Sequence, residues 1–205
     1  MAIQFLNGFY LPALAQSPVV FWIYDISVTG FLPVLIYFAL TKLNVSPREY
    51  GFKKPYSLYT TEKVAGQALM LFMGAGIVYF IARSLLLALY PPSNSFFYGN
   101  VIPTEGILRL LAALFFSVSA GVVESAIYLG IAKLLIDEKL KGSAGRYVFV
   151  IVSTVVFASV HWEQGVALMI TAGITQLIFS LAYLRINYLL PFIAAHAAID
   201  FVIFY

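Results

Sequence analysis

The 205-residue chain is 62% hydrophobic and 10% charged, with a mean hydropathy of +0.93. It has too few polar residues to cover a water-facing globule of that size, so we predict an integral membrane protein surrounded by the lipid bilayer. The net charge of +3 comes without a basic helix or a basic patch interleaved with aromatics, so no nucleic-acid partner is expected. The lack of cysteine excludes disulfides, thiolate nucleophiles and cysteine-bound metals.

Apolar runs along the chain predict an all-α fold, a polytopic transmembrane helical bundle. About six runs approach the roughly 20 residues that a helix needs to cross the hydrocarbon core. The sequence has no internal repeat and no soluble second domain, so we interpret residues 1–205 as a single integral membrane domain. The predicted spans are Val19–Leu40, Val64–Tyr90, Ile107–Leu135, Tyr147–Val166, Ala167–Leu184 and Leu189–Phe204.

Positive charges gather in two of the loops between these spans. The first loop holds Lys42, Arg48, Lys53, Lys54 and Lys63, and the second holds Lys139, Lys141 and Arg146. By the positive-inside rule these loops and the turn at Arg185 face the cytoplasm, which puts both termini outside. We expect a multi-pass protein of a prokaryotic cytoplasmic (inner) membrane. Residues 1–15 carry no Lys or Arg, so we prefer an interfacial or re-entrant lead-in to a cleaved signal peptide.

Two charged residues lie inside predicted spans toward the outer side. Asp25 and Arg83 are each roughly 9 to 10 Å from the outer end of their helices. A charge in the hydrocarbon region is costly unless it has a partner or reaches water. Two hypotheses follow: an ion pair between Asp25 and Arg83, or Arg83 extending alone to the interface.

Three titratable side chains on three predicted helices lie at a similar depth in the bilayer. Counted from the cytoplasmic ends, Glu124 lies roughly 17 Å deep, His161 about 21 Å and His196 about 15 Å. The two histidines are the only ones in the chain. Each residue alone is compatible with a buried hydrogen-bonding role, but the common depth favours a joint functional site.

The residue types in this group suit the activation of a water molecule. Glu124 and His161, if both reach one water, can take up its proton as a general base. His196 and Asp200 are four residues apart on one helix, so they share a face, and Asp200 can accept a hydrogen bond from His196 and fix its tautomer. Zinc is the competing explanation for two histidines and two carboxylates, although the His-x-x-x-His spacing of zinc proteases is absent.

The spacing of these residues resembles the CPBP family, the CAAX-protease and bacteriocin-processing group of intramembrane glutamic endopeptidases. The similar stretches are Glu124-Ser-Ala-Ile-Tyr-Leu-Gly130, Phe157-x-x-x-His161 and His196-x-x-x-Asp200. They cover roughly Gly121 to Tyr205, inside a catalytic core at about 107–205. The resemblance implies that Glu124 and His161 activate the water. It also implies that His196 and Asp200 stabilise the tetrahedral oxyanion, without a metal or cofactor.

Two positions depart from the first motif of the family, which usually reads Glu-Glu-x-x-x-Arg-Gly. Ser125 replaces the second Glu and Leu129 replaces the Arg, whereas Glu124 and Gly130 match. The two missing residues look like a charge pair, so their joint loss leaves no orphan charge.

We therefore predict an enzyme, a glutamic-type intramembrane protease that hydrolyses a peptide bond of a membrane-associated protein or peptide. One alternative is a CPBP-like peptide-binding or immunity protein that does not cut, which the departures at Ser125 and Leu129 favour. The other is a proton-coupled transporter that uses Glu124 as a relay. The sequence indicates no particular oligomeric state.

Overall fold

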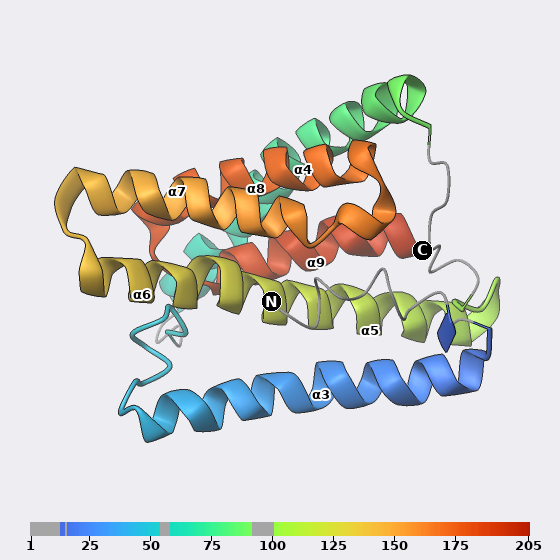
Figure 1. The fold of residues 1–205 in the computed structure, drawn as a ribbon, viewed down its shortest axis with the longest axis horizontal. Helices are drawn as coiled ribbons and strands as arrows, with labels where there is room; N and C mark the ends of the chain where they lie inside the picture. The colour runs from blue at the N-terminus through green and yellow to red at the C-terminus, as the bar shows by residue number, and fades with distance from the viewer. Residues whose placement is uncertain (1–12, 15, 54–57, 92–100) are drawn as a thin grey trace.

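The computed structural model describes residues 13–14, 16–53, 58–91 and 101–205. All the regular structure in those ranges is helical, which confirms the predicted all-α fold (Figure 1). The elements are α3 (Pro18–Lys42), α4 (Leu58–Leu89), α5 (Gly106–Ser125), the π-helix η2 (Ala126–Ile131), α6 (Ala132–Lys139), α7 (Gly142–Ser159), the 3-10 helix η3 (Trp162–Gln164), α8 (Val166–Ile186) and α9 (Leu190–Phe204). Lys54 and most of the predicted lead-in at residues 1–15 lie outside the described residues.

Five helical stretches in the described part are long and apolar enough to cross a membrane. They are α3, α4, the continuous stretch from α5 through η2 to α6, α7, and α8. The sixth predicted span is helical as α9, but it has only 15 residues. Its rise of roughly 22 Å is less than the hydrocarbon core of about 30 Å. The chain is thus a polytopic helical bundle, with five full-length candidate spans and one shorter apolar helix among its described residues.

The predicted span Tyr147–Val166 is wrong at its C-terminal end. α7 stops at Ser159, and a short 3-10 turn separates it from α8. Gly165 has a φ of +88°, a conformation that side chains other than glycine's rarely adopt, so the chain turns there and α8 begins. His161 consequently lies in the turn between two helices, not inside a span.

Close packing in the C-terminal half holds the bundle together. α5 runs along α9, α7 packs on α8, and α4 covers both α8 and α9 (Figure 1). At Gly121 the α5 backbone approaches α9 so closely that an added Cβ would lie 2.8 Å from the Ile193 carbonyl oxygen. By contrast α3 lies beside α5 with most of its surface uncovered, and Phe21 is its one fully buried residue. The residues of the predicted core therefore form the tightest part of the molecule.

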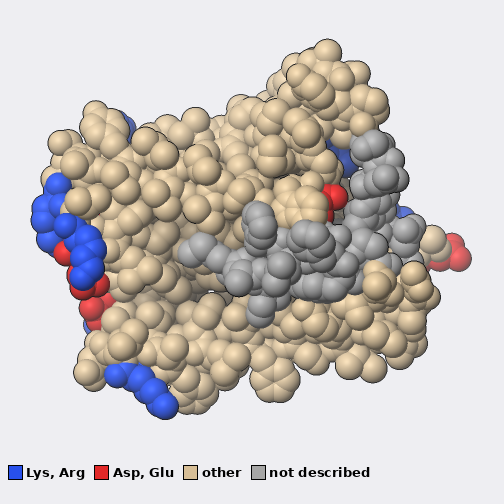
Figure 2. Space-filling view, in the orientation of Figure 1, with Lys and Arg blue, Asp and Glu red and all other residues tan. Residues whose placement is uncertain are grey.

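Most Lys and Arg residues lie at one end of the bundle, where α3 and α8 end and α4 and α7 begin. Figure 2 shows this basic end at the left, at the turn from α6 to α7. Only Arg83 and Arg109 among the described Lys and Arg residues lie toward the opposite end. Of the two hypotheses for Asp25 and Arg83 the ion pair is wrong, because no salt bridge joins these two described residues. Asp25 Oδ2 and Arg83 Nε are also both buried without a hydrogen-bond partner among the described residues.

Candidate active site

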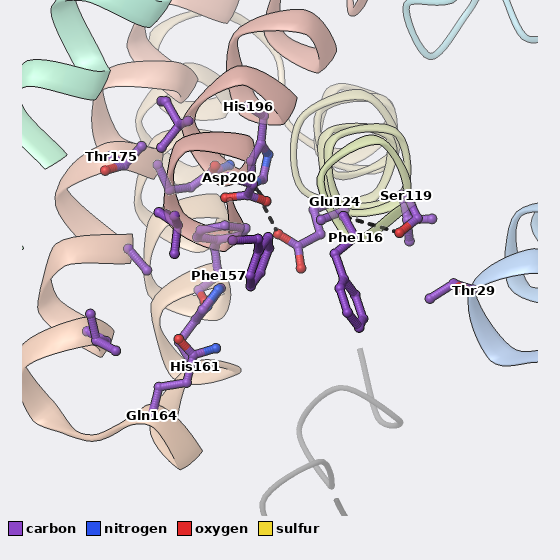
Figure 3. Close-up of a pocket in the computed structure, with 18 of the residues that line it drawn as sticks. Thr29, Phe116, Ser119, Glu124, Phe157, His161, Gln164, Thr175, His196 and Asp200 are labelled. Carbon is purple, nitrogen blue, oxygen red and sulfur yellow. Dashed lines mark hydrogen bonds and ion pairs between the residues drawn. The ribbon is translucent and has the colours of Figure 1, made fainter. Parts of the chain in front are cut away.

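A cavity of about 220 Å³ lies among the helices that carry the predicted site residues. Its walls come from α3, α5, α8 and α9, with Phe157 of α7 and Tyr79 of α4. All four predicted site residues line it: Glu124, His161, His196 and Asp200 (Figure 3). The fold thus brings the four side chains to one space large enough for a water and part of a peptide.

Glu124, His196 and Asp200 form the most compact part of the site. His196 Nε2 lies 3.5 Å from Glu124 Oε2 and 3.5 Å from Asp200 Oδ2. The three side chains are largely withdrawn from solvent, with exposed fractions of 13% for His196, 16% for Glu124 and 17% for Asp200. One ring nitrogen of His196 therefore faces two carboxyl groups, one from the same helix and one from α5.

A backbone contact fixes the ring of His161. Its Nδ1 lies 2.8 Å from the carbonyl oxygen of Phe157, four residues earlier. A carbonyl only accepts hydrogen bonds, so Nδ1 carries the proton and Nε2 keeps a free lone pair. The Phe157 ring lies between the two histidines, with its centroid 4.7 Å from that of His161 and 6.1 Å from that of His196. His161 is therefore oriented as a proton acceptor at the cavity.

Glu163 follows His161 in the same turn, outside the candidate spans. Its Oε2 is buried without a hydrogen-bond partner. Burial raises the pKa of Glu163 to about 7, so near neutral pH its carboxyl group is partly protonated. The neighbouring Gln164 lines the cavity. The turn between α7 and α8 thus adds polar groups that the sequence did not single out.

The π-helix η2 begins at Ala126, two residues after Glu124, and widens the helix there. Such segments occur often at functional sites. Ser153 Oγ of α7 donates to the carbonyl oxygen of Tyr128 in this π-helix at 2.6 Å, and Gln176 Nε2 of α8 donates to Ser153 Oγ at 2.7 Å. All three residues are buried. This polar relay, which connects three elements next to Glu124, was missed in the sequence because it pairs distant residues and one backbone carbonyl.

Ser125 and Leu129, the two positions that depart from the first motif of the CPBP family, are both buried. Leu129 is 1% exposed and lies in the main hydrophobic cluster, while the buried Ser125 Oγ has no hydrogen-bond partner. Neither position leaves a charge without a counterion in the core. Leu129 packs among apolar side chains, so an apolar residue suits this position.

The lining residues reach from the middle of the bundle to the end opposite the basic loops. They include Tyr24 in the first half of α3, His161 and Gln164 in the α7–α8 turn, and Phe204 at the end of α9. No residue of the basic end lines the cavity. Among the described residues, no group of three or more His, Asp or Glu side chains has a geometry that could hold a metal ion.

One comparison with known proteins matches the C-terminal half of the chain. Residues 106–202 match the family model described as "Type II CAAX prenyl endopeptidase Rce1-like". No curated protein and no solved structure matches the chain. The matched range runs from the first residue of α5 into α9 and contains all four predicted site residues. This part of the chain is similar to the Rce1-like family of CAAX-type proteases, and the apolar helices make the protein an integral membrane one.

Proposed function

We propose that the protein is an intramembrane endopeptidase of the glutamic type that cuts a membrane-associated protein or peptide. The observation that carries the proposal is the convergence of Glu124, His161, His196 and Asp200 on one cavity inside an apolar bundle. Two proton acceptors and a histidine between carboxyl groups are the parts that peptide hydrolysis by an activated water requires.

In this mechanism a water molecule lies between Glu124 and the free Nε2 of His161. Glu124 takes one proton from the water as its oxygen bonds to the scissile carbonyl carbon. The carbonyl oxygen becomes an oxyanion, and His196 donates a hydrogen bond to it from Nε2. When the C–N bond breaks, the proton on Glu124 passes to the leaving amine, and the two products carry a new carboxylic acid group, which keeps the second proton of the water, and a new amino group.

Asp200 has a positioning role in this proposal. It lies one helical turn after His196 and faces the same ring nitrogen at 3.5 Å. Before the reaction a carboxyl oxygen there accepts from Nε2–H and keeps the proton on that nitrogen, and the oxyanion takes over this hydrogen bond as it forms. Asparagine offers a carbonyl oxygen at the same place, so the role does not require a negative charge.

The proposal includes an orientation in a prokaryotic cytoplasmic membrane. The positive-inside rule places the basic end of the bundle in the cytoplasm. The cavity lies in the other half, so its substrate approaches from the non-cytoplasmic side. Substrates in this orientation are proteins or peptides anchored at, or exported through, the membrane.

A second candidate function is peptide binding without cleavage. Ser125 and Leu129 favour it, because the charge pair expected next to Glu124 is replaced by a hydroxyl and an apolar side chain. Such a protein would keep the cavity and bind a peptide whole, as an immunity protein does. The two functions differ in one measurable product, a new peptide terminus.

Mass spectrometry of peptide termini tests the proposal directly. Membranes are compared from cells of the source organism that carry the intact protein, Glu124→Gln, or Glu138→Gln as a matched control. The control removes a carboxylate on α6 whose side chain is 63% exposed and lies outside the cavity. We expect termini that appear with the intact protein and with Glu138→Gln but not with Glu124→Gln. Identical termini in all three, at equal expression, would favour peptide binding.

A further inference from the structure

The wall of the cavity that faces the catalytic residues belongs to α3. Tyr24, Asp25, Val28, Thr29 and Leu32 form it, on successive turns of one helix face. Figure 3 shows Thr29 on this wall, across the cavity from Glu124. The mechanism proposed above uses no residue of α3. This wall is therefore free to contact the part of a substrate that does not react.

Asp25 is the one ionisable carboxyl group on this wall, and the described residues offer its Oδ2 no hydrogen-bond partner. Its Oδ2 is buried without a hydrogen bond, and no ion pair joins it to any described Lys or Arg. The nearby Thr29 hydroxyl donates to the backbone carbonyl of Asp25 at 2.6 Å, so it does not serve the carboxyl group. A carboxyl group among membrane helices is costly without a donor, and such groups commonly mark binding sites.

The charged side chains that line the cavity are all acidic. Its lining contains Asp25, Glu124 and Asp200 but no Lys or Arg among the described residues. The remaining lining is mostly aromatic and aliphatic, with Phe116, Phe157, Leu168 and Phe179 among it. Carboxyl groups inside apolar walls favour a guest that is positively charged at one point and apolar along its length.

We propose that Asp25 is a specificity-determining residue that binds a Lys or Arg side chain of the substrate, close to the scissile bond. A basic side chain matches both features of the cavity, because its methylene stem packs on apolar walls and its head donates to a carboxylate. The inference rests on the proposed function and adds a substrate class to it: membrane-associated peptides with a basic residue beside the cut. An uncharged donor such as Gln would leave the acidic cavity uncompensated.

The first experiment compares the cut sites of the intact protein with those of Asp25→Asn, by mass spectrometry of termini in the membranes described above. Asparagine keeps the size of the side chain and removes its charge. We expect Lys or Arg to be enriched next to the cuts made by the intact protein and depleted next to those made by Asp25→Asn. Cut sites without a basic residue in the intact protein would overturn the inference.

The second experiment measures steady-state kinetics of the purified full-length protein on two synthetic peptides. Both span a cut site found in membranes, one with its basic residue and its twin with Met, whose unbranched stem is similar but uncharged. For the basic peptide we expect Asp25→Asn to raise KM roughly tenfold or more with little change in kcat, since a hydrogen bond to a charged group is lost. Asp25→Glu should restore most of the affinity, and neither variant should alter KM for the Met twin.

The matched control for these variants is Ser27→Ala, which lies on α3 outside the cavity. It removes an exposed hydroxyl that donates to the Ile23 carbonyl of its own helix and should leave both peptides unaffected. If Asp25→Asn changed KM equally for both peptides, the inference would be overturned. Asp25 would then have a packing role or bind the amine of a lipid headgroup. If Glu124-dependent cleavage occurs without these differences, only the inference fails. If the intact protein makes no cuts at all, the proposed function fails and the inference fails with it.

Discussion

The two ends of the bundle hold the same types of charged residue in opposite surroundings. At the basic end, Lys139 and Glu138 contact one another with side chains 77% and 63% exposed, and Lys133 pairs with Asp137 one turn away on α6. In the other half, Glu124 and Asp200 are largely buried and face a histidine inside a cavity that no Lys or Arg lines.

This contrast separates charges that place the protein in its membrane from charges that act on a ligand. Exposed ion pairs contribute little to stability, and their main consequence here is topology. Buried carboxyl groups without a cation are costly, and they persist where a substrate or a proton supplies the missing partner. Location, more than residue type, therefore separates the two roles.

The largest effect that would test this contrast is on catalysis. We expect Glu124→Gln to lower the rate of cleavage by about 10²- to 10⁴-fold, because the amide cannot take up a proton from water. Asp200→Asn should keep measurable activity, since its carbonyl oxygen still accepts from His196. Turnover of a peptide that spans a mapped cut site gives both values. Equal losses in the two variants would remove the different roles assigned to these carboxyl groups.

The orientation of the two ends gives the next largest difference. The chain has no cysteine, so single substitutions report accessibility without background. Ser46→Cys lies in the exposed loop at the basic end, Thr104→Cys is exposed at the opposite end, and Gln164→Cys lines the cavity. A membrane-impermeant thiol reagent applied to spheroplasts should label Thr104→Cys and Gln164→Cys at least several-fold faster than Ser46→Cys. The reverse pattern would place the cavity on the cytoplasmic side.

Close helix contact beside the cavity predicts a smaller effect, on stability. A Cβ at Gly121 would lie 2.8 Å from the Ile193 carbonyl oxygen and 3.2 Å from the Ala197 Cβ, so Gly121→Ala must push α5 away from α9. We expect a loss of about 1 to 3 kcal/mol, seen as a lower Tm in detergent. Gly30→Ala on α3 is the control, because nothing lies within 4 Å of its added Cβ. A similar loss in both would mean that α5 and α9 are not closely packed.

The sequence predicted those features of this molecule that depend on local pattern. Long apolar runs located the helices, and the spacing from His196 to Asp200 placed both on one helix face. The end of α7 was missed, because long apolar runs lie on both sides of the short polar stretch at residues 163–165, and the positive φ of Gly165 reveals the turn there. Of the two hypotheses for Asp25 and Arg83 the ion pair was wrong, since equal depth in a bilayer says nothing about which faces of two helices meet.

The polar relay next to Glu124 could not be predicted from the sequence. Its removal has the smallest expected effect, a loss of stability. Ser153→Ala leaves the Tyr128 carbonyl and the Gln176 amide without their shared hydroxyl. Hydrogen bonds between membrane helices are worth about 0.6 kcal/mol on average, so the expected loss of stability is of order 1 kcal/mol.

The adjacent Thr154 is the control, because its buried Oγ1 has no hydrogen-bond partner and Thr154→Val should keep or slightly raise the Tm. If the relay also holds the π-helix in place, Ser153→Ala lowers kcat for a mapped peptide more than it raises KM, and Ser153→Thr, which keeps the hydroxyl, restores part of that loss. If Ser153→Ala changed the Tm but not kcat, the relay would serve stability only. The position of Glu124 would then not depend on the hydrogen bond to the Tyr128 carbonyl.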